Sequence, residues 1–211
     1  MALTLTPVPG LPLIKSGDDL PEIILASLER AGISLISGDI LVLAQKIVSK
    51  SEGRLVRLSE VTPSKQAEDL AAVTQKDPRF IELVLQESRE VLRTRLGTIV
   101  VEHKQGFVCA NAGIDHSNVL GDRTDTDLEE WFLLLPEDSD ASARKIRDSI
   151  QATTGQNVGI LIIDSHGRAW RLGTVGVAIG VAGVPGLVDL RGTQDLFGYT
   201  LRVTMVAASD E

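Results

Sequence analysis

The apolar run Val158-Gly-Ile-Leu-Ile-Ile163 constrains the fold most, because it is unbroken and is followed at once by Asp164-Ser-His-Gly-Arg168. A continuous apolar run of this length is typical of a strand that is buried on both faces. We therefore expect a sheet that other elements cover, with Asp164 at the end of one strand. A carboxylate in that place indicates catalysis or metal binding, and an Asx turn that caps the strand explains it equally well.

Helix start signals lie between the apolar runs. An acidic residue or threonine stands one or two positions before a proline three times, and each of these signals precedes an apolar face. The predicted helices follow Asp18–Pro21 and end at Gly32, follow Thr62-Pro63, follow Asp77-Pro78 with Val91 on the apolar face, and run from Ser139 or Asp140 to Gly155.

Short runs rich in branched residues predict the strands. They are Ile40–Leu43, Thr98–Glu102, Gly106–Cys109, Val158–Ile163 and Leu201–Val206. Lys104-Gln105-Gly106 is typical of a hairpin turn, so we expect an α+β fold in which helices pack on a mixed β-sheet. We expect residues 1–211 to form one domain, and the acidic stretch Gly121–Glu130 to be an exposed loop that could divide it into two lobes.

Composition excludes several classes of function. The net charge of -8 and an aromatic content of 3% disfavour binding to nucleic acid.

The apolar stretch Val175–Val188 is interrupted by glycines and is shorter than the roughly 18 residues of a membrane-spanning helix. With no basic, apolar leader at the N-terminus, we expect a cytoplasmic protein. Cys109 is the lone cysteine, and its apolar neighbours favour a core position over a nucleophile.

The stretch Cys109-Ala-Asn-Ala-Gly-Ile-Asp-His-Ser-Asn118 repeats the pattern of a predicted strand that leads to a carboxylate, Asp115. Asp115 and Asp164 could meet around one ion, and oxygen ligands suit Mg²⁺ or Mn²⁺. The histidines, which are His103, His116 and His166, lie in or near these two segments. Their spacing disfavours zinc, so we expect them to contact substrate or to be exposed to solvent.

Basic residues near the predicted strand ends could neutralise phosphates, although most surface cations do not. They are Lys46, Lys50, Arg54, Arg168 and Arg171. The chain has no Gly-Lys-Ser/Thr phosphate loop, so a nucleotide would have to be held in another way. Glycines recur at 173, 176, 180, 183 and 186, which permits either close approach of a ligand or close packing of elements.

Several motifs, taken together, resemble the coenzyme F420-0:L-glutamate ligase family in order and spacing. They are Gly10-Leu-Pro-Leu-Ile-Lys15, Gly17-Asp-Asp19, Gln45-Lys-Ile-Val-Ser-Lys50 with Glu52-Gly53, Asn111–Asn118, Leu134-Leu-Pro-Glu-Asp138 and Asp164-Ser-His-Gly-Arg168. The similarity extends from about Pro7 to Glu211. Each motif alone is weak evidence for this family, but the combination of motifs is specific to it.

The resemblance implies the fold of that family and a ligase that uses GTP to join L-glutamate to coenzyme F420-0, and then adds further γ-linked glutamates. By this account an acyl phosphate forms on the acceptor, and two divalent ions (Mg²⁺ or Mn²⁺) and K⁺ assist. It also implies an intertwined homodimer. Matched by position, Asp115 and Asp164 bind the first metal and Ser165 the second. The matched GTP contacts are Gly10, Leu11, Pro12, Leu13, Gln45, Lys50 and Asn118.

One departure from the family keeps alternatives open. Family members continue past the position of Glu211 to a glycine-rich turn that carries another acidic metal ligand and nucleotide contacts. The sequence therefore also fits a shortened, inactive module that binds F420-0 or nucleotide. A metal-dependent phosphohydrolase built on the same aspartates is a third hypothesis. No residue is predicted as acid, base or nucleophile.

Overall fold

The structure is a computed structural model, and it describes residues 3–119 and 130–211. The fold is α+β, as predicted. Its longer helices are α1 (Leu20–Arg30), α2 (Gln45–Ser51), α3 (Lys65–Thr74), α4 (Pro78–Gln86) and α5 (Ser139–Thr154). Its strands are β1 (Ile40–Ala44), β2 (Leu55–Arg57), β3 (Ser88–Arg95), β4 (Thr98–His103), β5 (Val108–Ala110), β6 (Trp131–Leu133), β7 (Gly159–Gly167), β8 (Thr174–Ala182), β9 (Val188–Asp189) and β10 (Met205–Val206).

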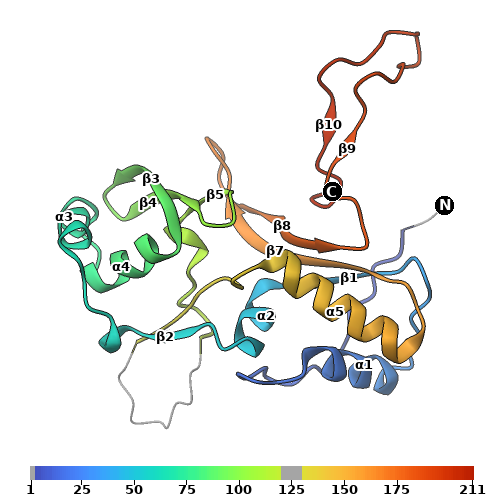
Figure 1. Ribbon diagram of the computed structural model, residues 1–211, viewed down its shortest axis with the longest axis horizontal. Helices are drawn as coiled ribbons and strands as arrows, with labels where there is room; N and C mark the ends of the chain where they lie inside the picture. The colour runs from blue at the N-terminus through green and yellow to red at the C-terminus, as the bar shows by residue number, and fades with distance from the viewer. Residues whose placement is uncertain (1–2, 120–129) are drawn as a thin grey trace.

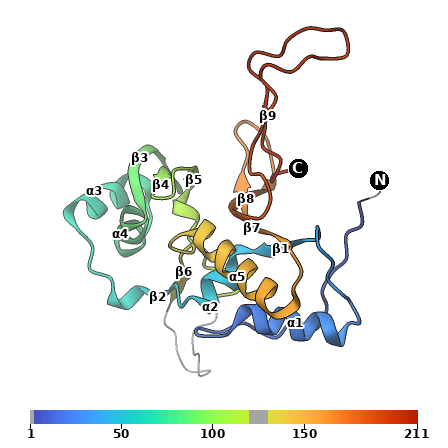
Figure 2. The ribbon, with the colours of Figure 1, turned by 45° about the vertical axis from the view of Figure 1, so that its right-hand side comes forward.

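The central sheet has the order β1-β7-β8, with β7 parallel to β1 and antiparallel to β8. A mixed sheet was predicted, and it is present. Helices α1 and α5 lie along this sheet in both views (Figures 1 and 2), and their apolar faces share one core with it. Ile160 and Ile162 of β7 are completely buried in that core.

The opposite face of the central sheet is less covered than the sequence predicted. Leu161 and Ile163 are only half-buried, and Ile40 and Val42 on β1 are 51% and 53% exposed. Val42 pairs with Leu161, so these side chains share one face. The expectation that the Val158–Ile163 run is buried on both faces is therefore wrong within the described chain, because α1 and α5 pack on the other side.

A second unit consists of the antiparallel sheet β3-β4-β5 with α3 and α4 (Figure 1). The predicted hairpin is present, since Gly106 donates its amide to the carbonyl of His103. Val91, however, lies in β3 and not on a helix. Helix α4 ends at Gln86, and the alternating pattern that follows belongs to a strand.

The helix boundaries follow their capping residues. Asp19, Asp77 and Asp138 each accept a hydrogen bond from a backbone amide in the first turn of their helix. Helix α3 is capped by Ser64 and not by the predicted Thr62. The expected loop Gly121–Glu130 lies outside the described residues except for Glu130.

The C-terminal segment forms an arm that extends from the body in both views (Figures 1 and 2). The predicted strand Leu201–Val206 is reduced to Met205–Val206, which pairs with Val188–Asp189. Leu196 and Phe197 in the arm are 97% and 96% exposed. Within residues 3–119 and 130–211, no helix has the length and apolar character needed to cross a membrane.

Candidate functional site

Asp164 lies where the central sheet narrows. Pairing of β1 with β7 ends at Ile163, while β7 continues to Gly167 against β8 alone. Asp164 is therefore inside a strand, and the predicted strand end is wrong for β7. Strand β1 ends at Ala44, and the Asp164 side chain lies beside an open cavity. A register shift in β8 opposite Ile162 and Ile163 coincides with this narrowing.

Asp115 is held by its backbone. Its amide and carbonyl each make a 2.9 Å hydrogen bond with Leu133 of β6. The preceding turn places Asn111 and Ala112 at positive φ, a conformation that costs free energy and persists when neighbours enforce it. Asp115 therefore projects from a defined turn, as its position after a strand predicted.

The first turn of α2 contacts the Asp115 carboxylate from both sides. The Gln45 amide donates a 2.6 Å hydrogen bond to Oδ2, and Lys46 Nζ lies 3.2 Å from Oδ1. Burial raises the pKa of Asp115, the Lys46 charge opposes that shift, and the nearby Asp164 charge adds to it. The two predicted metal-ligand aspartates are thus close enough to interact.

Two lysines of α2 hold the turn that follows Asp115. Lys46 Nζ donates to the carbonyl and hydroxyl oxygens of Ser117, both at 3.1 Å, and Lys50 Nζ donates to the carbonyl of Asn118 at 2.7 Å. Lys50 and Asn118, predicted separately as nucleotide contacts, are therefore neighbours. Both α2 lysines therefore fix the position of this turn, and their contacts with a nucleotide remain predictions.

A cavity of about 890 Å³ brings most of the predicted chemistry together. Asp115, Asp164 and Ser165 all line it, as do the cations Lys46 and Arg168. Asn111 also lines it, and its buried Oδ1 has no hydrogen-bond partner among the described residues. The cavity lining therefore combines oxygen atoms that could bind a cation with positively charged side chains.

Other predicted site residues lie outside this cavity. Gly10, Leu11, Pro12 and Leu13 are exposed and do not line it, and the Gly10 carbonyl accepts a 3.3 Å hydrogen bond from Arg30. Gln45 is 1% exposed, with its oxygen occupied by Ser49 Oγ at 2.9 Å. Their contacts with GTP remain predictions.

The histidines differ from expectation in one case. His116 is exposed and stacks on Phe132, and His166 lines the cavity with Nε2 3.3 Å from Asp164 Oδ2. His103 is buried and stacks on Phe107, so its predicted exposure or substrate contact is wrong. In the described part of the chain, no three histidine, cysteine or acidic side chains are grouped as metal ligands.

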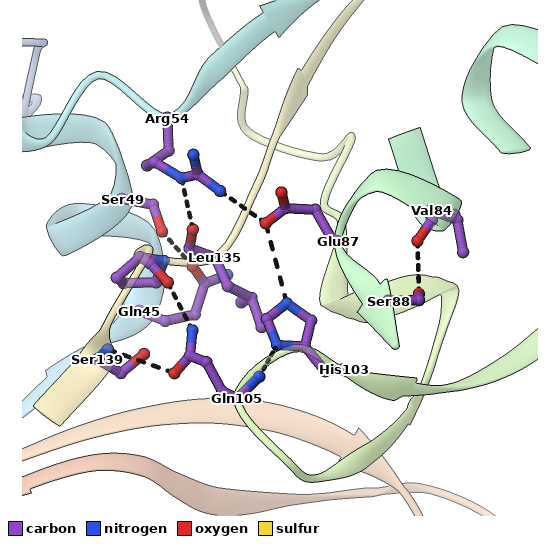
Figure 3. A network of polar contacts seen from close by, with 11 residues as sticks. Gln45, Ser49, Arg54, Val84, Glu87, Ser88, His103, Gln105, Leu135 and Ser139 are labelled. Atoms are coloured by element: carbon purple, nitrogen blue, oxygen red, sulfur yellow. Dashed lines mark hydrogen bonds and ion pairs between the residues drawn. The ribbon is translucent and has the colours of Figure 1, made fainter. Parts of the chain in front are cut away.

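His103 belongs to a polar network that joins the β3-β4-β5 unit to the segments around Arg54 and Leu135 in the rest of the protein (Figure 3). Arg54 donates to the Leu135 carbonyl at 2.8 Å and to Glu87 Oε2 at 2.6 Å. Gln105 donates to the Pro136 carbonyl at 2.6 Å. Arg54 is therefore a structural residue and is not free to bind phosphate as its sequence position suggested. Arg171 is exposed.

The core position predicted for Cys109 is confirmed, and the structure decides between the two alternatives for the glycine repeat at Gly180. Cys109 is buried in the core of the second unit, and burial raises the pKa of its thiol to about 11, which suppresses the nucleophilic thiolate. The glycine repeat serves close packing at Gly180, where an added Cβ would lie 2.4 Å from the Ser139 carbonyl oxygen.

The sequence as a whole matches the family described as F420-0:Gamma-glutamyl ligase, over residues 10–211. The chain belongs to the F420-0:gamma-glutamyl ligase family. A relative named coenzyme F420:L-glutamate ligase, from Methanothermobacter thermautotrophicus, is 45% identical over all of this chain and 81% of its own length. Relatives with the same name from Methanopyrus kandleri and Archaeoglobus fulgidus are 43% and 44% identical, over 99% and 100% of this chain and 77% and 79% of theirs.

The cavity of this F420-0:gamma-glutamyl ligase family member also has residues that our sequence reasoning missed. Arg93 and Arg95 of β3 line it, as does Trp170 at the tip of the β7–β8 hairpin. The alternation Arg93-Thr-Arg95 was an available signal for two arginines on one strand face. It was missed because β3 was taken for the end of a helix.

Proposed function

We propose that this protein is a GTP-dependent ligase that adds L-glutamate to coenzyme F420-0, and then further γ-linked glutamates. Asp115 and the adjacent pair Asp164 and Ser165, which are distant in the chain, line one cavity together with Lys46. That observation carries the proposal. Membership in the family, and relatives named for this ligation, support it.

The side chains fit a hard divalent cation. Asp115 and Asp164 offer carboxylate oxygens, and the buried Asn111 Oδ1, which has no hydrogen-bond partner among residues 3–119 and 130–211, lines the same cavity. Mg²⁺ or Mn²⁺ needs few protein ligands, because water and substrate phosphates complete its coordination. Such an ion would neutralise charge on the transferring phosphoryl group. We propose two divalent ions, with Ser165 toward the second, and K⁺ as a further cation.

The protein's own groups would mainly align the reactants. Lys46 supplies positive charge beside Asp115, and Arg168 adds a cation elsewhere on the cavity lining, so nucleotide phosphates would lie near Lys46. In the proposed reaction the acceptor carboxylate takes the γ-phosphoryl group and GDP leaves. The glutamate amine then attacks the acyl phosphate, forms the amide bond, loses a proton and releases phosphate. Alignment of oxygens is the chief demand of phosphoryl transfer.

Omission of single substrates tests the proposal. GDP release should require F420-0, L-glutamate and Mg²⁺ or Mn²⁺ together, and the product should gain the mass of glutamate. GTP turnover that is unchanged without F420-0 would contradict it, and would favour a phosphohydrolase. Binding of F420-0 by calorimetry without any GDP release would favour the non-catalytic binding module.

We also propose that the protein forms a homodimer. The arm carries exposed Leu196 and Phe197, and the central sheet has exposed Ile40 and Val42 on its uncovered face. Exposed apolar surfaces of this kind mark interfaces. A second copy of this chain carries the same two surfaces, so the arm of each copy has an apolar surface on the other copy to pack against. Each arm could then cover apolar surface on its partner, as an intertwined dimer requires.

Light scattering after size-exclusion chromatography tests the dimer. The wild type should have twice the 22.6 kDa chain mass, and Phe197→Asp should shift it toward the monomer. Val73→Asp is the matched control, since Val73 is 57% exposed on α3 and away from the arm. A monomeric wild type, or a dimer that Phe197→Asp leaves intact, would rule out an arm-mediated dimer.

A further inference from the structure

The β3-β4-β5 sheet presents one face to the core and the other to the cavity. Ile99 and Val101 of β4 are completely buried, and Cys109 of β5 is on the same side. The alternate residues face the cavity. They are Arg93, Arg95, Thr98, Val100, Val108 and Ala110. This face therefore combines a strip of aliphatic side chains with two cations.

The side chains of Arg93 and Arg95 make no ion pair or hydrogen bond with any residue in the described part of the chain, whereas their backbones pair with β4. They lie on the same side of β3, opposite Val100 and Thr98 of β4. Their α-carbons are roughly 7 Å apart by the strand repeat. By contrast, Arg89 on the same strand is paired with Glu102 at 3.2 Å and does not line the cavity.

The opposite wall of the cavity has a different character. The segment from Asp164 to Trp170 forms it, and Trp170 projects fully into solvent at a positive φ. The cavity volume, about 890 Å³, exceeds what an amino acid needs and suits a ligand of cofactor size. Aliphatic and aromatic surface favours a planar ring system, and two guanidinium groups that have no partner among the described residues favour an anion.

We propose that this face binds the acceptor of the ligation, an aromatic molecule with an anionic chain. The ring lies over Val100, Val108 and Ala110, and Arg93 and Arg95 hold negative charge on the acceptor. The acceptor carboxylate then extends toward Asp115 and Asp164. This inference rests on the proposed function, and it assigns Arg93 and Arg95 to recognition of the acceptor and not of the nucleotide.

Single substitutions test the assignment. We compare wild type with Arg93→Gln, Arg95→Gln and the matched control Arg89→Gln, which removes the same charge from the same strand outside the cavity. Calorimetry measures F420-0 binding without nucleotide, and steady-state kinetics measures KM for each substrate. Circular dichroism and the melting temperature report on folding.

Arg93→Gln and Arg95→Gln should each weaken F420-0 binding, and raise its KM, about ten- to hundredfold, as expected for the loss of a charge-assisted hydrogen bond. KM for GTP and for glutamate should change less than about twofold, and Arg89→Gln should match wild type. A selective rise in KM for glutamate or GTP would overturn the inference, as would unchanged F420-0 binding in both variants. If F420-0 binding depends on the arginines but no turnover occurs, the inference is supported and the ligase function is contradicted. If turnover occurs and neither substitution changes it, the ligase function is supported and the inference is contradicted.

Discussion

Gln45 holds Asp115 through a 2.6 Å hydrogen bond from its amide nitrogen, while its own amide oxygen accepts a 2.9 Å hydrogen bond from Ser49. All three residues are buried or half-buried. The chain Ser49, Gln45, Asp115 therefore sets both the orientation of the Gln45 amide and the position of a proposed metal-binding carboxylate.

Replacing Gln45 with methionine should disturb Asp115 without removing it. We expect the concentration of Mg²⁺ or Mn²⁺ needed for half-maximal turnover to rise about ten- to hundredfold, the usual cost of losing such a supporting contact. Gln86→Met, at an exposed position of α4, is the control. If Gln45 contacted GTP instead, KM for GTP would rise while the metal requirement stayed constant.

Neutral analogues of the two aspartates test the proposed metal site. Asp115→Asn and Asp164→Asn should each reduce turnover at least a hundredfold while the fold is retained, because a neutral amide is a poorer ligand for a hard cation. Asp148→Asn, on the exposed face of α5, should retain activity. Full activity of either cavity variant would remove that residue from the metal-binding role.

Gly180 and Gly176 form a matched pair on β8. At Gly180 an added Cβ would lie 2.4 Å from the Ser139 carbonyl oxygen, whereas at Gly176 the nearest atom is 3.8 Å away. Gly180→Ala should therefore lower the free energy of unfolding by about 2 kcal/mol or more, and Gly176→Ala should leave it unchanged or slightly higher. Urea denaturation measures both. Equal stability of the two variants would mean that α5 does not pack this closely on β8.

Burial of His103 predicts a dependence of stability on pH. Burial, together with the charges of Lys104, Arg54 and Arg89, lowers the pKa of His103 from 6.5 to about 4, although Glu87 Oε2 lies 4.0 Å from Nε2. Between these values the unfolded chain binds a proton that the folded chain does not. The free energy of unfolding therefore falls as pH decreases from about 6.5 to 4, by at most about 3 kcal/mol from this residue.

The His103 contribution can be isolated with His103→Gln, which does not titrate. Urea denaturation at several pH values gives the free energy of unfolding as a function of pH. Between pH 4 and 6.5 this free energy should change less steeply with pH for the variant than for wild type. Carboxylates titrate in both proteins, so the difference between the two slopes reports on His103. Identical slopes would show that His103 is not buried in its neutral form.

The local elements could be predicted where short-range signals determine them. Capping aspartates followed by proline mark α1 and α4, and Lys104-Gln105-Gly106 marks the β4–β5 turn. The incorrect predictions of secondary structure occur where contacts with distant segments determine whether a residue is in a helix or a strand. Val91 has an apolar side chain that suits either a helix or a strand, and pairing with Val101 of β4 makes it a strand residue.

The sequence by itself determined which chemical groups are available and which segments carry them: Asp115, Asp164 and Ser165 with lysines nearby, in a pattern specific to one family. Tertiary structure alone decided that Asp115 and Asp164 line one cavity, that Arg54 is paired with Glu87, and that the side chains of Arg93 and Arg95 line the cavity with no partner among the described residues. The physical reason is that propensity and capping act within a few residues, whereas burial, strand pairing and charge pairing depend on segments far apart in the chain.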